Sequence, residues 1–228
     1  MHPLDNVIWH ALTTRHAKFA ESFDQARRFM PEITSLAAFL EPTDRGYESL
    51  AELISTQGTV ALFLAKPHEP RPGWNLVAAT SMPQMVCEHA SSPLTRSSSD
   101  PEVVDLGPAD VPEMMELTAL TKPGPFNRRT HELGTYLGIR RDGKLVAMAG
   151  ERLKVPGYTE VSAVCTHPEH IGQGYARILM TEVMHRIRDR GEKPFLHVRE
   201  DNVRAITLYK RLGFSQRVLS HLAVLRKV

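Results

Sequence analysis

The stretch from Glu160 to Ala176, EVSAVCTHPEHIGQGYA, holds the residue types best suited to chemistry. Glu160 is a carboxylate that could accept a proton. Gly172 and Gly174 lie in a turn directly before a helical pattern that begins at Tyr175. The first N–H groups of a helix have no partner inside the helix, and the helix dipole adds partial positive charge there. Because glycine has no side chain to block a phosphate, the turn predicts an anion site built from backbone N–H groups.

Two common phosphate-binding patterns do not fit this turn. A P-loop requires Gly-Lys-Ser/Thr after its last glycine, and the residues that follow Gly174 are Tyr175 and Ala176. A Gly-x-Gly-x-x-Gly turn requires its third glycine where this chain has Arg177. The sequence therefore disfavours an enzyme that binds nucleotide phosphates in either way.

A strand and a helix must flank the turn and position it. Residues 160–166 are rich in β-branched side chains and end at His167-Pro168, which is typical of a strand. The residues after the turn predict a helix with one apolar face, ending near Gly191. The apolar face consists of Ala176, Leu179, Met180, Val183, Met184 and Ile187. Further elements are a buried strand at 194–198, a helix capped by Asp201 or Asn202, and a final strand with its own turn at 214–228.

The residues before this stretch predict a second group of elements. They are a strand at 103–106, a helix at 108–120, an irregular loop at 122–126, a short helix at 127–133, and a hairpin with strands at 135–140 and 144–153. Asp142-Gly143 is the hairpin turn, and Pro156-Gly157 turns the chain into the strand that carries Glu160. The combined order predicts a mixed α/β sheet with helices on its faces.

Two local strings resemble the GNAT acyltransferases. Ile171–Ala176 is similar to their acyl-CoA pyrophosphate loop, Arg/Gln-x-x-Gly-x-Gly/Ala, except that Ile171 replaces the polar first residue. The string Asn202…Ala205…Leu208-Tyr209-x-x-x-Gly213-Phe214 resembles their second signature. The resemblance covers about residues 103–226 and is nearest to the glycine N-acyltransferase branch of the family. It implies a GNAT-type mixed sheet with flanking helices. It implies acetyl-CoA as co-substrate and no metal; because of Ile171 we expect weaker CoA binding.

The resemblance also implies roles for single residues. Glu160 is the expected general base and Tyr209 the expected general acid that protonates the CoA thiolate. By strand alternation Glu160 shares a face with Ser162, Val164 and Thr166. Phe126 and Arg129 are expected to contact the acceptor. The residues expected to contact CoA are Val164 and Thr166 at the strand edge, Ile171, Gly172, Gln173, Gly174, Tyr175 and Ala176 in the turn, and Asn202.

Each of these residues also has a structural interpretation. Glu160 could be a solvated glutamate at a strand start, Tyr209 a core aromatic, and Asn202 a helix cap. His167 and His170 have no further ligand cluster near them, and Cys165 is expected packed on the face opposite Glu160. The preferred function is an N-acetyltransferase that moves an acetyl group to a primary amine by direct attack. The alternative is a non-catalytic protein that binds acyl-CoA.

The first hundred residues show no chemical motif. They predict helices at 7–29, 33–40 and 47–54, a hairpin of strands at 59–65 and 74–80, and a further strand at 82–88. The Ser- and Pro-rich segment 90–101 predicts a linker, so we expect a smaller α+β domain at 1–100 and the acyltransferase domain at 101–228. We expect the first domain to shape the acceptor cleft.

Composition excludes several classes of protein. The 228 residues are 42% hydrophobic and 24% charged, contain no apolar run of membrane-spanning length, and begin without a signal-peptide pattern. With only two cysteines, a reducing cytoplasmic location is expected. Residues 101–228 hold 20 Lys and Arg against 15 Asp and Glu but no dense basic tract. We expect a small-molecule amine or amino acid as partner, no nucleic acid and no membrane, with a homodimer left open.

Overall fold

The structure is a computed structural model that describes residues 2–88 and 100–228. Most of the predicted linker, up to residue 99, lies outside the described residues. Within the described residues no helix is long and apolar enough to cross a membrane.

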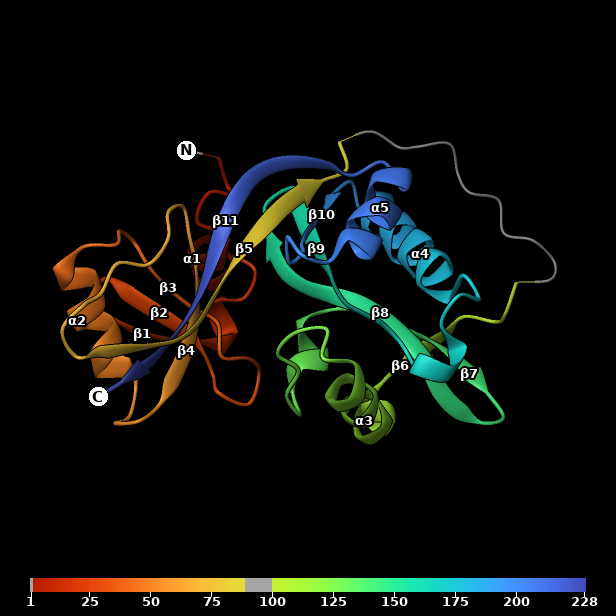
Figure 1. The fold of residues 1–228 in the computed structure, drawn as a ribbon, viewed down its shortest axis with the longest axis horizontal. Coiled ribbons are helices and arrows are strands. Elements are labelled where there is room, and N and C mark those ends of the chain that lie inside the picture. Colours follow the sequence, from red (N-terminus) through yellow and green to blue (C-terminus); the bar gives the residue numbers. More distant parts are fainter. Residues whose placement is uncertain (1, 89–99) are drawn as a thin grey trace.

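Most of the chain is organised around one eight-stranded mixed sheet (Figure 1). Every neighbouring pair of strands in it is antiparallel except β9 and β10, which run parallel. In sheet order the strands are β4 (Thr59–Leu64), β11 (Ser215–Lys227), β5 (Trp74–Val86), β10 (Lys193–His197), β9 (Tyr158–Thr166), β8 (Lys144–Val155), β7 (Tyr136–Arg141) and β6 (Val104–Leu106). The predicted mixed sheet is confirmed.

Helices cover both faces of the second half of this sheet. One apolar cluster joins the sheet to α4 (Tyr175–Asp189) and α5 (Val203–Arg211), and another joins it to α3 (Val111–Thr121). The predicted stripe of α4 is buried, with Leu179, Met180 and Ile187 fully enclosed. A short 3₁₀ turn at Thr130–Leu133 stands where a helix was predicted at 127–133. Another 3₁₀ turn, Pro108–Asp110, lies directly before α3.

The first 43 residues fold differently from the prediction, whereas the helix predicted at 47–54 is confirmed by α2 (Asp44–Leu53). The structure forms α1 (Val7–Thr13), a 3₁₀ turn (Ala17–Phe19), and a three-stranded sheet of β1 (Ala20–Phe23), β2 (Ala26–Phe29) and β3 (Ala37–Phe39). The predicted helix at 7–29 was wrong beyond Thr13, and the one at 33–40 was wrong. Asp24 adopts a positive φ of 42°, which makes a tight turn between β1 and β2 and is incompatible with a continuous helix.

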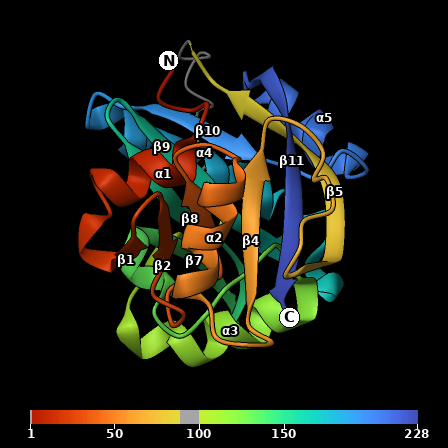
Figure 2. The same cartoon turned by 90° about the vertical axis from the view of Figure 1, so that its left-hand side faces the viewer.

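The predicted hairpin of strands 59–65 and 74–80 was also wrong. β4 and β5 do not pair, because β11 from the C-terminus lies between them and pairs with both. β5 runs unbroken through both strands predicted for residues 74–88, and β11 bulges near Gln216 but has no turn. Figure 2 shows β4, β11 and β5 side by side. The boundary predicted at residue 100 therefore does not separate two sheets, since strands from both sides of the linker form one.

Candidate active site

The sheet opens between β9 and β10, and this opening positions the site. The two parallel strands pair only from Lys193↔Tyr158 to Phe195↔Glu160. Beyond this point β10 is paired only with β5, on its opposite edge. β9 continues to Thr166 and is paired there only with β8. The β10-facing edge of residues 161–166 therefore carries backbone N–H and C=O groups without a neighbouring strand. Such an edge can pair with an extended ligand that carries amides.

A β-bulge in β9 changes which side chains share a face. Val161 and Val164 both pack into the cluster beneath α4, although an odd spacing should separate them. Ala163, with φ 51°, and Cys165 pack on the opposite face beneath α3. The extra residue shifts the alternation by one. The predicted shared face of Glu160 with Val164 and Thr166 was therefore wrong, as was the placement of Cys165 on the face opposite Glu160. Cys165 is packed, and burial raises the pKa of its thiol to about 11.

The glycine turn lies at the end of this open edge. Gly172 and Gly174 have φ values of +94° and +79°, and a Cβ added to either would meet open space. Ile171 is half-exposed beside them. Gly174 is the N-cap of α4 without a side-chain cap, and no acceptor among the described residues meets the N–H groups of 172–177. The turn thus presents several unpaired donors at the positive end of a helix.

A tyrosine and an arginine brace this turn, which sequence reasoning did not anticipate. The hydroxyl of Tyr175 donates to the Gln173 side-chain oxygen, and Arg141 Nε donates to the same hydroxyl over 2.9 Å. The Arg141 guanidinium also lies 5.3 Å from the ring centre of Tyr175. The side chains of Gln173 and Tyr175 are therefore engaged with the protein, and their backbone is what remains for a ligand. A lone Arg at the end of a hairpin strand gives no sequence signal of this brace.

Tyr209 and Asn202 lie on α5, over the same side of the sheet as α4. Tyr209 is 9% exposed and belongs to the cluster against which Val164 of β9 packs. Burial raises the pKa of Tyr209 to about 12, so the phenol is protonated at neutral pH. Within the described residues its hydroxyl has no hydrogen-bond partner. Asn202 caps α5, because its Oδ1 accepts from the Ala205 N–H over 3.1 Å, as the structural interpretation predicted.

Glu160 is fully buried and held by other side chains. Both carboxylate oxygens accept from Arg152, each over 2.8 Å, and His197 Nδ1 lies 2.7 Å from Oε1. Burial by itself would raise the pKa of Glu160, but the charge and hydrogen bonds of Arg152 and the bond from His197 outweigh it and lower the pKa to about 2. A carboxylate with such a pKa and both oxygens occupied is a poor proton acceptor. This environment does not fit the predicted general-base role.

Glu160 belongs to a row of polar side chains that crosses five consecutive strands, β11, β5, β10, β9 and β8. Gln84 accepts from Arg217 with its oxygen over 2.9 Å, and its amide nitrogen donates to the Leu4 carbonyl over 2.9 Å. That nitrogen also lies 3.2 Å from His197 Nε2, so Nε2 is the acceptor and Nδ1 carries the hydrogen bonded to Glu160. An ionised Glu160 fits this arrangement, because both of its oxygens accept hydrogen bonds.

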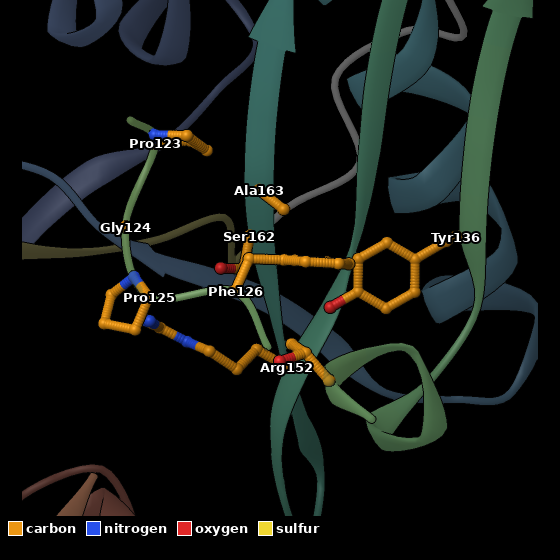
Figure 3. A pocket seen from close by; sticks show the side chains of 9 residues that line it. Pro123, Gly124, Pro125, Phe126, Tyr136, Arg152, Ser162 and Ala163 are labelled. Carbon is orange, nitrogen blue, oxygen red and sulfur yellow. The ribbon is translucent and has the colours of Figure 1, made fainter. Parts of the chain in front are cut away.

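A small pocket lies beside this row, on the α3 side of the sheet (Figure 3). Its lining residues come from the loop before Tyr136 and from β7, β8 and β9: Pro123, Gly124, Pro125, Phe126, Thr130, Tyr136, Arg152, Ser162 and Ala163. Phe126, predicted to contact the acceptor, is among them. Arg129, the other predicted contact, is not; its guanidinium pairs with Glu132 over 2.7 Å outside the pocket. Arg152 provides the pocket with a guanidinium instead, and no sequence motif marked it.

His167 and His170 lie in the loop between β9 and the glycine turn. His167 accepts from the Glu169 N–H, and the rings of His167 and His170 lie 5.9 Å apart. In the part of the chain that the structure describes, no three or more His, Cys, Asp or Glu side chains form a metal-binding group.

Comparisons of sequence connect this site to known proteins. A family model described as FR47-like protein matches residues 136–222, which include β9, the glycine turn and α5. N-alpha-acetyltransferase RimI of Mycobacterium tuberculosis is 37% identical over 41% of this chain and 61% of its own length. A mycothiol acetyltransferase of Kytococcus sedentarius is 36% identical over 44% of this chain and 34% of its own length. The chain thus spans less than two thirds of either relative.

Solved structures extend the similarity to the whole chain. A crystal structure from Novosphingobium aromaticivorans, assigned to the GNAT family of acetyltransferases, is 35% identical with a TM-score of 0.91 and covers both chains completely. A GCN5-related N-acetyltransferase from Kribbella flavida has a TM-score of 0.58 at 16% identity, covering 96% of this chain and 95% of that one. Both matches include the N-terminal part, but the second, at 16% identity, shows the fold alone.

Proposed function

The chain belongs to the GNAT family of acetyltransferases, and on that premise we propose that it is an N-acetyltransferase that moves an acetyl group from acetyl-CoA to a primary amine. The observation that carries this proposal is one continuous path. The open edge of β9 at 161–166 leads to the unpaired N–H groups of the glycine turn at 172–177. An extended chain of amides that ends in a diphosphate matches this path, because strand edges bind amides and helix N-termini bind phosphates.

CoA binding would use the backbone more than the side chains. The pyrophosphate would lie on the N–H groups of Gly172 to Ala176, and the pantetheine amides would pair with β9 at Val164 and Thr166. The open space over Gly172 and Gly174 supports this placement, since apart from each glycine and its two chain neighbours no described atom lies within 4 Å of where the Cβ would be. Asn202 is occupied as a helix cap, so we expect at most a secondary contribution from it to CoA binding.

The transfer would proceed by direct attack. The neutral amine forms the new C–N bond to the thioester carbon, the C–S bond breaks, and the proton lost from nitrogen passes to solvent. Tyr209 donates its phenolic proton to the departing thiolate and is then reprotonated from solvent. Tyr136 and Arg152, the ionisable side chains that line the pocket, cannot accept a proton at neutral pH. We assign Glu160 a positioning role through Arg152.

An assay of thiol release tests the proposal. The full chain with acetyl-CoA and a panel of primary amines should release CoA in proportion to acetylated amine. Binding of CoA in a calorimeter without turnover on any amine would favour the alternative, a non-catalytic acyl-CoA binder. No heat with millimolar CoA would exclude both. The relatives are named an N-alpha-acetyltransferase and a mycothiol acetyltransferase, so the panel should contain amino acids, peptides and simple amines.

Several finer predictions remain to be tested. The nearest branch within the family, the acyl-chain length, a cytoplasmic location and a homodimer stay predictions. The N-terminal residues do not line the described pocket, so a role in shaping the acceptor site would act through the sheet that they share with the acyltransferase elements.

A further inference from the structure

Tyr136 places a hydroxyl without a partner at the pocket. The side chain is 2% exposed, and its oxygen is buried with no hydrogen-bond partner in the described structure. A buried hydroxyl that makes no hydrogen bond costs about 1–3 kcal/mol of stability. In Figure 3 this hydroxyl points from the ring toward Phe126 and Arg152. Tyr136 is among the residues that line the pocket.

The ring of Tyr136 is fixed so that the hydroxyl cannot turn to another partner. Tyr136 lies opposite Gly150 of β8, and a Cβ on Gly150 would come within 2.3 Å of the ring. The glycine therefore allows the ring to lie directly on the neighbouring strand. On the other side Phe126 packs edge-on, with ring centres 5.6 Å apart. Burial also raises the pKa of Tyr136, so the group stays a neutral donor.

Arg152 adds a second donor to the same pocket. Its Nε and Nη2 atoms donate to Glu160, and its Nη1 atom has no hydrogen bond within the described residues. The polar row from Arg217 to Glu160 holds the guanidinium in place from behind. Because Glu160 balances its charge, the pocket presents hydrogen-bond donors with no net positive charge. Such a site accepts either a neutral carbonyl or a carboxylate oxygen.

We propose that the Tyr136 hydroxyl and Arg152 Nη1 recognise an oxygen that the acceptor carries beside its reacting amine. The acceptor class is then an α-amino acyl group, either a free amino acid or the first residue of a peptide. This inference rests on the proposed acetyl transfer, because it places the amine at the β9 wall of the pocket, near Ser162 and Ala163. The carbonyl or carboxylate oxygen would lie on the β7 and β8 side, against the two donors.

Four acceptors separate the alternatives in the acetyl-CoA assay. Glycinamide and glycine both carry the oxygen, as does a short peptide that begins with glycine, and ethylamine lacks it. The rates are compared per neutral amine, because glycinamide is a weaker base than ethylamine. On that scale we expect kcat/KM for glycinamide to exceed that for ethylamine by about tenfold or more, as one or two hydrogen bonds to neutral groups would give. A comparison of kcat/KM for free glycine with kcat/KM for the peptide shows whether the α-amino acyl group comes from a free amino acid or from a peptide. Ethylamine used as well as the other three acceptors would overturn the inference while leaving the acetyltransferase intact.

The variant Tyr136→Phe tests the donor itself. It should lower the ratio of kcat/KM for glycinamide to kcat/KM for ethylamine about tenfold, mainly through KM for glycinamide, and leave the affinity for CoA unchanged. Its melting temperature should stay the same or rise, because the variant removes an unsatisfied buried hydroxyl. Tyr47→Phe is the matched control: Tyr47 is also buried, but its hydroxyl bonds His68 outside the pocket. It should cost stability and leave acceptor selectivity unchanged.

The two failures can be told apart. If no amine is turned over by the parent chain, the proposed function is wrong. If amines are turned over but Tyr136→Phe lowers the rates for glycinamide and ethylamine equally, or lowers stability with no change in selectivity, Tyr136 serves the fold and the acceptor inference is wrong.

Discussion

The two residues predicted to move protons are both buried, but their pKa values shift in opposite directions. Tyr209 lies in an apolar cluster, and burial alone raises its pKa to about 12, which keeps the phenol protonated. Glu160 is buried too, but Arg152 and His197 stabilise its charge and lower its pKa to about 2. The first environment suits a proton donor. The second suits a fixed negative charge that aims a neighbouring guanidinium.

Tyr209→Phe should separate the acid role from a packing role. The ring stays and only the proton is lost, so we expect kcat to fall by about 10²-fold while KM for acetyl-CoA hardly changes. Stability should not fall, because the hydroxyl has no partner among the described residues. Steady-state and single-turnover kinetics measure the change in rate and in KM, and thermal melting measures the change in stability. An unchanged kcat would reduce Tyr209 to a core aromatic.

Glu160→Gln should lower activity without changing the shape of the pH–rate profile. The variant leaves Arg152 buried without its counter-charge, which costs about 3–5 kcal/mol when one partner of a buried pair is removed. If Glu160 were the base, the acidic limb of the profile would disappear. In the parent chain its lowered pKa contributes stability that is present above about pH 4.5 and is lost as the pH falls toward 2. Acid unfolding of parent and variant measures that contribution.

The glycine turn and the first turn of α4 act together as one element. Positive φ at Gly172 and Gly174 turns consecutive N–H groups outward, and α4 adds its dipole behind them. Arg141, Tyr175 and Gln173 brace the turn from the side. Ile171 differs from the family pattern in its side chain only, and the backbone donors do not depend on that side chain. CoA affinity should therefore depend chiefly on the shape of the turn.

Gly174→Ala should weaken CoA binding as well as the fold. A left-handed alanine costs about 1–2 kcal/mol. Gly143 offers a matched control, because it has the same φ of +79° and also open space at its Cβ position, but lies in the β7–β8 hairpin turn. Both variants should lose similar stability in chemical denaturation. Only Gly174→Ala should raise the Kd for CoA, by about tenfold, or about 1.4 kcal/mol. Equal Kd values in calorimetry would place the diphosphate elsewhere.

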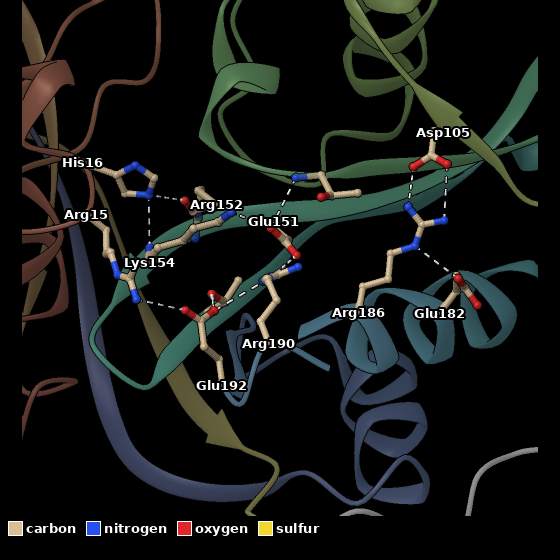
Figure 4. A network of polar contacts seen from close by, with 12 residues as sticks. Arg15, His16, Asp105, Glu151, Arg152, Lys154, Glu182, Arg186, Arg190 and Glu192 are labelled. Atoms are coloured by element: carbon tan, nitrogen blue, oxygen red, sulfur yellow. Dashed lines mark hydrogen bonds and ion pairs between the residues drawn. The ribbon is translucent and has the colours of Figure 1, made fainter. Parts of the chain in front are cut away.

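The N-terminal part is tied to the acyltransferase elements across the whole molecule. β4 and β5 belong to the shared sheet, and polar contacts add to it (Figure 4). His16 Nε2 lies 2.9 Å from the backbone carbonyl oxygen of Arg152 and 3.1 Å from the backbone nitrogen of Lys154. His16 thus contacts the backbone of the arginine that lines the pocket. Buried Glu151 is paired with Lys154 and Arg190. The fold near residues 151–154 therefore depends on residues far earlier in the chain.

His16 should make the stability of the whole chain depend on pH. Burial lowers the pKa of His16 to about 4, so the folded state holds the ring neutral while the unfolded state protonates it near 6.5. Stability should be complete above about pH 6.5 and fall, by up to about 3 kcal/mol, as the pH drops toward 4. Urea unfolding between pH 7.5 and 4.5 measures this loss. His16→Gln should flatten the curve, while the exposed His185→Gln should not; equal curves for both variants would contradict it.

The sequence by itself determined the local elements around the glycine turn. Four features follow from short-range patterns: the strand predicted at 160–166, the helix from Tyr175, a cap at Asp201 or Asn202, and the Asp142-Gly143 hairpin. The patterns are β-branched runs, helical spacing, capping side chains and turn residues. Those patterns act over a few residues, so one chain segment suffices to specify them. The same reasoning failed at 7–29, where apolar spacing fits a helix although the chain turns at Asp24.

Only the tertiary structure decided which strands lie side by side and which distant side chains meet. No local pattern places β11 between β4 and β5, or brings Arg152, Glu160 and His197 together from three strands. The bulge at Ala163 moves Cys165 to the pocket side, since a single extra residue shifts strand alternation in a way that composition does not reveal. Tyr136 reads as an ordinary strand aromatic in the sequence. Its lone hydroxyl becomes informative because burial and the pairing across to Gly150 remove every other partner.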